Sequence, residues 1–132
     1  MNIIILAAGE GKRLRPLTDS VPKSLVEIEN KSLMQRHIEF FQKLNEKEII
    51  IIGGYKHHKL NGFGKHLIVN DNYHKTNMVW SLFCARDFLN EDSIITYGDC
   101  LYHKEILTDI LLSPDEITVA IDMNWASYWH QR

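Results

Sequence analysis

Apolar runs alternate with amphipathic segments along this chain, and their spacing predicts alternating strands and helices. Runs rich in β-branched residues predict buried strands at 2–6, 48–54, 66–70, 93–99 and 116–122, with a minor strand at 25–28. Helical spacing predicts helices at 32–45, 55–60, from Met78 onward, and at 103–112. Ser32 and Gln35 fit a capping box at the start of the first helix, and Thr76 or Asn77 is the expected cap of the third. Strands that alternate with helices favour an α/β protein with a mostly parallel sheet covered on both faces.

The bulk properties narrow the class of protein without identifying it. The 132 residues predict one domain, 1–132, with an ordinary globular balance of 45% apolar and 24% charged residues. The formal net charge of -2 gives no general attraction to nucleic acid or to a membrane surface. The apolar run at the N-terminus is too short for a signal peptide, and no run is long enough to span a bilayer. Cys84 and Cys100 lack metal-type spacing, so a reduced, cytoplasmic protein is the simplest expectation.

The most informative stretch follows the first predicted strand. Residues 6–18 read LAAGEGKRLRPLT, and the segment PKSL at 22–25 closes the stretch. Small residues and glycines let the backbone approach a ligand closely, and the carboxyl ends of strands are where open α/β sheets bind ligands. Lys12, Arg13 and Arg15 add positive charge beside this turn. The stretch therefore predicts an anion site, most naturally for phosphate groups.

Two familiar phosphate motifs do not match. A P-loop needs four residues between its glycines and then Gly-Lys-Ser/Thr, whereas Gly9 and Gly11 are one residue apart. The dinucleotide fingerprint needs a third glycine or alanine where Leu14 stands. A plain glycine turn with a solvated basic edge is the alternative that the pattern leaves open.

The compound pattern of strand, LAAG, GxR, PLT and PKSL resembles the signature of the sugar-phosphate nucleotidylyltransferase superfamily. Asn72, Tyr73 and Asn77, followed by Ser81-Leu82, resemble its CTP:phosphocholine cytidylyltransferase-like branch, which activates small phosphates. The resemblance covers essentially the whole chain and implies a Rossmann-like, three-layer α/β/α nucleotidyltransferase fold. The family's domain is longer, so the chain resembles its N-terminal, nucleotide-binding part, and a truncated form is expected.

The resemblance implies a role for each matching residue. Arg13 would stabilise the departing phosphates, and Lys23 would neutralise the α-phosphate or the incoming phosphate. Asp99, at the end of a predicted strand, would hold Mg²⁺, although a turn aspartate is the simpler alternative. Nucleotide binding is expected of Leu6, Ala7, Ala8, Gly9, Glu10, Gly11, Lys12, Asn77 and Ser81.

Further expectations concern the acceptor side and the helix at 32–45. Asp122 and Trp125 would contact the acceptor, with packing an equally open reading for the tryptophan. His37 is expected to be a core histidine rather than a ligand.

The implied activity is that of a Mg²⁺-dependent cytidylyltransferase. It would transfer CMP from CTP to a phosphocholine- or phosphoglutamine-like phosphomonoester, release pyrophosphate, and serve the modification of bacterial surface polysaccharides such as capsule or lipooligosaccharide. CTP and a small phosphorylated acceptor are the expected partners, with no nucleic acid or membrane, and a homodimer is compatible with this reading. A hexose-1-phosphate uridylyl- or thymidylyltransferase is the enzymatic alternative. A nucleotide-binding regulatory domain or an inactive fragment is the non-enzymatic one.

Overall fold

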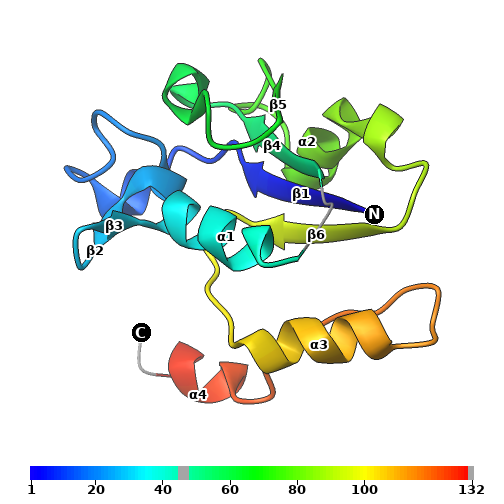
Figure 1. The fold of residues 1–132 in the computed structure, drawn as a ribbon. Helices are drawn as coiled ribbons and strands as arrows, with labels where there is room; N and C mark the ends of the chain where they lie inside the picture. The colour runs from blue at the N-terminus through cyan, green and yellow to red at the C-terminus, as the bar shows by residue number, and fades with distance from the viewer. Residues whose placement is uncertain (45–47, 131–132) are drawn as a thin grey trace. The chain divides into compact units, whose positions relative to one another are not determined.

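A computed structural model describes residues 1–44 and 48–130 of the chain (Figure 1). The chain divides into two compact units, Met1–Leu101 and Tyr102–Arg132. Each unit is described by itself below. No helix among the described residues has the length and apolar character needed to cross a membrane.

The first unit is built on a four-stranded, fully parallel sheet in the order β5-β4-β1-β6. These strands confirm four of the predicted strands, and their bounds are Asn2–Ala7 (β1), Glu48–Gly53 (β4), His66–Val69 (β5) and Ser93–Tyr97 (β6). A separate antiparallel hairpin pairs Glu27–Ile28 (β2) with Lys31–Ser32 (β3).

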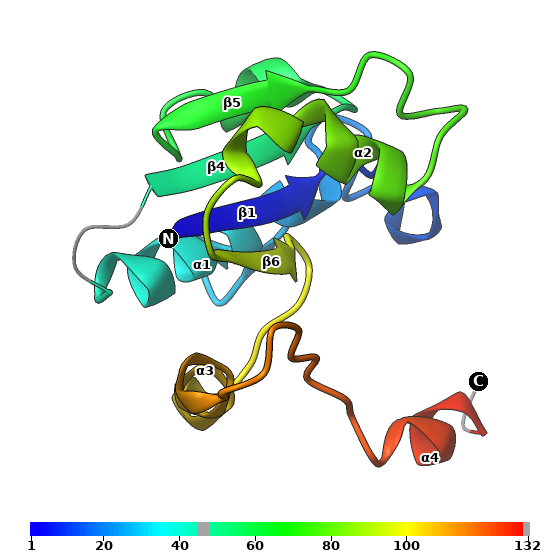
Figure 2. The ribbon, with the colours of Figure 1, turned by 90° about the vertical axis from the view of Figure 1, so that its right-hand side faces the viewer.

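Helices cover both faces of this sheet, as the sequence predicts for a three-layer α/β/α unit. Figures 1 and 2 show α1 (Leu33–Gln42) and α2 (Met78–Cys84) on opposite faces. Single turns of 3₁₀ helix connect the larger elements, at Lys12–Leu14 (η1), Lys23–Leu25 (η2), His57–Leu60 (η3) and Arg86–Phe88 (η4).

The start of α1 has the predicted capping box. The Gln35 backbone N–H donates to Ser32 Oγ at 3.1 Å, and the Ser32 N–H donates to Gln35 Oε1 at 3.0 Å. Two of the otherwise unpaired donors at the helix N-terminus are thereby satisfied. The helix ends at Gln42, and the last residue of the predicted range, Asn45, lies outside the described residues.

The core follows the period-two alternation of the isoleucine-rich strands. Ile4, Ile50 and Ile52 are fully buried and cluster with Ala85, which follows α2. Alternate strand residues point to opposite faces, so the buried Ile3 and Ile5 lie on the face that α1 covers. Strands buried on both faces read as continuous apolar runs, which explains why the sequence pattern located them well.

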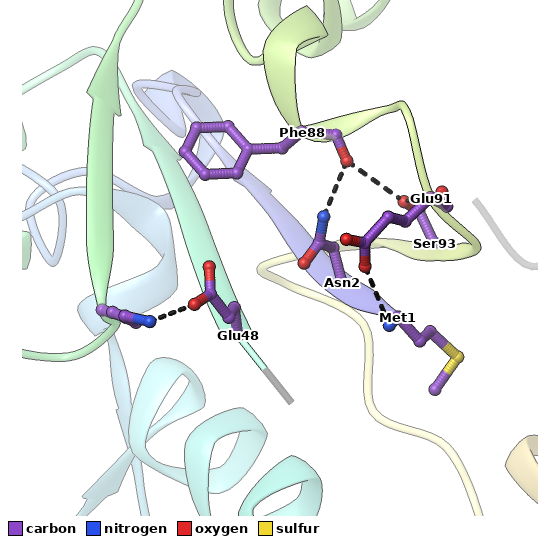
Figure 3. Close-up of polar contacts among 7 residues, drawn as sticks. Met1, Asn2, Glu48, Phe88, Glu91 and Ser93 are labelled. Atoms are coloured by element: carbon purple, nitrogen blue, oxygen red, sulfur yellow. Dashed lines mark hydrogen bonds and ion pairs between the residues drawn. The ribbon is translucent and has the colours of Figure 1, made fainter. Parts of the chain in front are cut away.

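Hydrogen bonds and an ion pair join polar groups at the amino ends of β1 and β6 (Figure 3). The Asn2 side-chain amide donates to the Phe88 carbonyl at 2.8 Å, and the Met1 ammonium lies 3.2 Å from Glu91 Oε2. The Ser93 hydroxyl donates to the Glu91 carbonyl at 2.9 Å. The polar groups at this end of the sheet therefore stabilise the fold.

The second unit contains α3 (Lys104–Leu112) and α4 (Trp125–Trp129). The strand predicted at 116–122 is wrong, because this segment has no regular structure. Ile117, Val119 and Ile121 alternate as in a strand and are 71–84% exposed. A strand exists only when its backbone groups pair with a neighbour, and the described part of this unit contains no other strand.

Candidate active site

The loops that follow β1, β4, β5 and β6 are joined by backbone hydrogen bonds at the carboxyl edge of the sheet. The Tyr55 N–H donates to the Ala8 carbonyl at 3.1 Å, and the Gly98 N–H donates to the Leu6 carbonyl at 2.9 Å. The Asn70 N–H donates to the Gly53 carbonyl at 2.8 Å. The residues predicted around the first loop, and Asp99 after β6, therefore meet at one edge.

The loop after β1 depends on Gly11. This residue has a φ of 68°, in the left-handed region that glycine adopts without steric cost. A Cβ there would lie 3.0 Å from Lys23 Cβ and 3.1 Å from Thr18 Cγ2. The buried Thr18 hydroxyl donates to the Gly11 carbonyl at 3.0 Å, which closes the loop on itself. Gly11 thus brings the two halves of the signature, at 6–18 and 22–25, into contact.

The same loop presents unused hydrogen-bond donors. Within the part of the chain that the structure describes, the backbone N–H groups of Gly9, Glu10 and Gly11 have no acceptor. These donors lie on an accessible loop, so they can bind water or a ligand. Successive N–H groups of this kind suit an anionic oxygen.

The cations of the loop fall into two groups. Glu10 is paired with Arg15 and lies 3.5 Å from Lys12 Nζ, so these two charges are partly neutralised by a carboxylate of the same loop. The guanidinium of Arg13 is exposed and has no ion-pair partner among residues 1–44 and 48–130. Arg13 is therefore the loop arginine that stays available to a ligand.

Lys23 and Asp99 form an ion pair across the site. Lys23 comes from η2 and Asp99 from the turn after β6, and Lys23 Nζ contacts Asp99 Oδ2. A Cβ on the neighbouring Gly98 would lie 3.1 Å from Ser24 Cβ, so the two segments pack closely at this glycine. About a third of each charged side chain is exposed, so both groups are open to solvent and to a ligand.

The donor set around Asp99 fits a metal that arrives with its ligand. Among the described residues, no group of three or more His, Cys, Asp or Glu side chains is arranged to hold a metal ion. Mg²⁺ commonly uses one or two carboxylates together with substrate phosphates and water. A single accessible carboxylate at Asp99 fits that pattern and does not fit a protein-only metal cage.

Asn77 and Ser81 occupy the first turn of α2, but their side chains differ in availability. Asn77 Oδ1 accepts the Trp80 N–H at 3.1 Å as the helix cap, which leaves its exposed amide N–H₂ group directed outside this contact. Ser81 is buried, and its hydroxyl donates to the Asn77 carbonyl at 3.3 Å. Asn77 is therefore the residue of the pair that can reach a ligand directly.

The pattern at 70–81 did not reveal the buried Asn70 as an organising residue. The Asn70 side-chain amide donates to Ser81 Oγ at 2.9 Å and to Thr76 Oγ1 at 3.0 Å. An asparagine at the end of a strand predicts only a turn from sequence. A polar residue directly after the apolar run 67–69 was the signal that could have indicated a buried hydrogen-bonding role.

His37 lies on the buried face of α1, as predicted for a core histidine. It is 2% exposed and stacks on Phe41, with ring centroids 6.2 Å apart. Burial lowers the pKa of His37 from its usual 6.5, while the Asp99 charge and a hydrogen bond with the Tyr97 backbone act to raise it. The neutral imidazole is thus favoured behind the turn that carries Asp99.

Asp122 and Trp125 belong to the second unit and shape its own local structure. Asp122 Oδ1 accepts the Asn124 N–H at 2.9 Å, and its carbonyl accepts the Trp125 N–H at 3.3 Å. Trp125 begins α4 and is 58% exposed. Their proposed acceptor contacts stay predictions.

The fold and the carboxyl-edge site define a nucleotidyltransferase-type domain. The model of the MobA-like NTP transferase domain matches residues 3–123, and the chain belongs to this family. This confirms the resemblance drawn from the signature.

Within this family, the chain is similar to cytidylyltransferases. The chain is 36% identical to the CTP:phosphoglutamine cytidylyltransferase of Campylobacter jejuni, over all of this chain and 56% of that protein. It is 35% identical to the choline-phosphate cytidylyltransferase of Streptococcus pneumoniae, over 86% of this chain and 51% of that one. The chain thus spans about half the length of the curated relatives it matches.

Solved structures of similar proteins support the assignment to this family. The CTP:phosphocholine cytidylyltransferase of S. pneumoniae matches with a TM-score of 0.69 and 38% identity, over 74% of this chain and 44% of that one. The inositol-1-phosphate CTP transferase of T. maritima matches with a TM-score of 0.67 at 24% identity, over 87% of this chain and 49% of that one, which supports the fold alone.

Proposed function

We propose that the protein transfers CMP from CTP to a small phosphomonoester and releases pyrophosphate, and that this chain binds the nucleotide. The observation that carries the proposal is the carboxyl-edge site, where free backbone donors, an unpaired arginine and an accessible Lys23–Asp99 pair lie on adjoining loops. The names of two relatives, a CTP:phosphoglutamine cytidylyltransferase and a choline-phosphate cytidylyltransferase, support this choice of nucleotide and acceptor.

The chemistry is an in-line displacement at the α-phosphorus of the nucleotide. An oxygen of the acceptor phosphate forms the new P–O bond, and the bond to the pyrophosphate oxygen breaks. Such a reaction depends mainly on orientation and on neutralising charge that develops in the transition state. The free N–H groups of Gly9 to Gly11 would orient the phosphates, and Arg13 would balance charge on the departing pyrophosphate. Lys23 would do the same at the α-phosphate or the incoming phosphate.

Asp99 is the residue proposed to hold Mg²⁺. When bound, the ion supplies Lewis-acid stabilisation of phosphate charge. Its single carboxylate implies that the remaining ligands come from the nucleotide and water, so the ion and the nucleotide would bind together. Lys23, which contacts the same carboxylate, would turn to the phosphates instead.

The acceptor and the setting are the finer parts of the proposal. An amine- or amide-bearing phosphate is the favoured acceptor, with Asp122 and Trp125 as candidates for contact with its cationic or amide group. The two cysteines are free in the structure, which is compatible with a reaction in the cytoplasm. The nucleotide-linked product would serve the modification of a surface polysaccharide.

The test is pyrophosphate release by the full-length protein. CTP, UTP, dTTP, ATP and GTP are crossed in Mg²⁺ with choline, ethanolamine, glutamine and glycerol phosphates and with sugar 1-phosphates. Release with CTP and one amine or amide phosphate supports the proposal. Release only with a sugar 1-phosphate moves the protein to the uridylyl- or thymidylyltransferase class, and nucleotide binding without release favours a regulatory domain.

Arg13→Ala tests the site within that assay. We expect kcat/KM to fall roughly a hundredfold, because an unpaired cation aimed at transition-state charge is lost. Arg86→Ala is the matched control, since Arg86 is an exposed arginine in η4, next to the amino-end contacts of β1. Near-normal turnover of Arg13→Ala would remove this residue from the mechanism.

A further inference from the structure

Asn70 is the buried central residue of a hydrogen-bond network between β5 and α2. It is 1% exposed, and every polar group that it carries is used. Its side-chain amide donates to Thr76 Oγ1 and Ser81 Oγ, and its Oδ1 accepts the Asn72 N–H at 3.0 Å. Its carbonyl accepts the Tyr73 N–H at 3.2 Å. One side chain therefore contacts the middle of the loop, the end of the loop and the helix that follows.

The network continues from the partners of Asn70. The Thr76 hydroxyl donates onward to the Asn72 carbonyl at 2.9 Å, and the Ser81 hydroxyl donates to the Asn77 carbonyl. Both hydroxyls thus accept from the Asn70 amide and donate to the backbone of the loop. Asn70 and Ser81 are both buried, so breaking the bond between them leaves buried polar groups unpaired, and this favours one conformation of the network.

The consequence falls on Asn77. Its backbone is held through Ser81, its Oδ1 is used by the helix cap, and its exposed amide is the part left for a ligand. α2 has only seven residues, and several of its apolar side chains, including Trp80 and Phe83, are more than half exposed. Apolar packing alone therefore fixes α2 weakly, and the Asn70 network supplies the remaining constraint on its first turn.

We propose that Asn70 is a positioning residue for nucleotide recognition, acting by holding the 71–77 loop and the first turn of α2 so that the Asn77 amide faces the nucleotide. This inference rests on the proposed function and on the nucleotide contact that the resemblance implies for Asn77. It predicts that loss of Asn70 raises KM for CTP, with a smaller effect on kcat.

The test compares Asn70→Ala with Asn2→Ala in the full-length protein. Asn2 is also a buried asparagine that donates a side-chain hydrogen bond, to the Phe88 carbonyl, but it lies at the amino end of β1 (Figure 3). Both variants are expected to lower Tm. We expect only Asn70→Ala to raise KM for CTP, by about tenfold or more, because a small misplacement of a contact group has large kinetic effects. Thr76→Val, which removes one acceptor and keeps the shape, should raise KM by a smaller factor and covers the case in which Asn70→Ala does not fold.

Hydrogen–deuterium exchange of residues 71–81 distinguishes a positioning role of Asn70 from a general loss of stability. Faster exchange confined to this segment in Asn70→Ala and Thr76→Val, together with a raised KM, supports the inference. Equal changes in KM for the Asn70 and Asn2 variants, or unchanged exchange at 71–81, overturn it. If the wild-type protein transfers no nucleotide at all, the proposed function fails, and the exchange data still decide whether Asn70 orders this segment.

Discussion

The Lys23–Asp99 ion pair leads to a prediction about divalent cations in the nucleotide-free protein. The ammonium of Lys23 contacts the carboxylate oxygen that a metal ion would need. Lys23→Met removes this positive charge and keeps most of the apolar side-chain stem. We therefore expect the variant to bind Mn²⁺, used as a spectroscopic substitute for Mg²⁺, more tightly than the wild-type protein does.

The size of the effect follows from the exposure of the pair. Lys23 and Asp99 have side chains that are 35% and 32% exposed, and exposed ion pairs contribute about 0.2–1 kcal/mol. Because a tenfold change in affinity corresponds to about 1.4 kcal/mol, Kd for Mn²⁺ should fall by a factor of up to about five. The affinity for CTP should change in the opposite direction, since the same lysine is proposed to contact the phosphates.

The assay is a titration of free Mn²⁺ by electron paramagnetic resonance at low ionic strength, without nucleotide. Lys12→Met is the matched control, because it removes the same charge from the same signature. The native Lys12 side chain contacts Glu10 rather than Asp99. Asp99→Asn should remove the gain when it is combined with Lys23→Met. An unchanged or weaker Mn²⁺ affinity of Lys23→Met would refute the competition between the lysine and the metal.

Two further predictions concern pH and the glycine turn. Because burial lowers the pKa of His37 below its unfolded value of 6.5, the unfolded chain binds more protons just below that pH, and stability falls as the pH falls from 6.5 toward the folded pKa. His37→Gln should remove this part of the pH dependence, measured as urea unfolding between pH 7.5 and 5.5; an identical pH dependence in both proteins would contradict it. Gly11→Ala should cost about 1–2 kcal/mol of stability for its positive φ and also weaken CTP binding, because the new Cβ meets Lys23. Gly62→Ala has the same backbone cost at φ 84° but open space around it, so equal CTP affinities of the two variants would contradict the packing argument.

Sequence reasoning located the first unit well because its strands are buried on both faces. Short, β-branched runs such as 3–5 and 49–52 favour buried strands, and the capping box at Ser32 marks the first helix by a local rule. The prediction at 116–122 was wrong for the opposite reason. An alternating apolar pattern indicates that a segment suits a sheet. Whether a neighbouring strand is present to pair with it depends on the rest of the structure.

The candidate site shows the same division between local and non-local information. The glycines and cations after β1 were predictable, because their chemistry is written in one continuous stretch. The pairing of Lys23 with Asp99 joins residues 76 positions apart, and the selection of Arg13 as the unpaired cation depends on where Glu10 points. Neither follows from a pattern along the chain, since both are set by how the loops pack.

The two ends of the sheet differ in a way that supports the placement of the site. At the amino end, Asn2, Ser93 and the Met1 ammonium find partners in the segment 88–91, so the polar groups there stabilise the fold and offer little to a ligand. At the carboxyl end, the N–H groups of Gly9 to Gly11 and the guanidinium of Arg13 have no partner among the described residues. Their concentration on one loop, which turns at the left-handed Gly11, suits an anionic ligand, as the proposed nucleotide site requires.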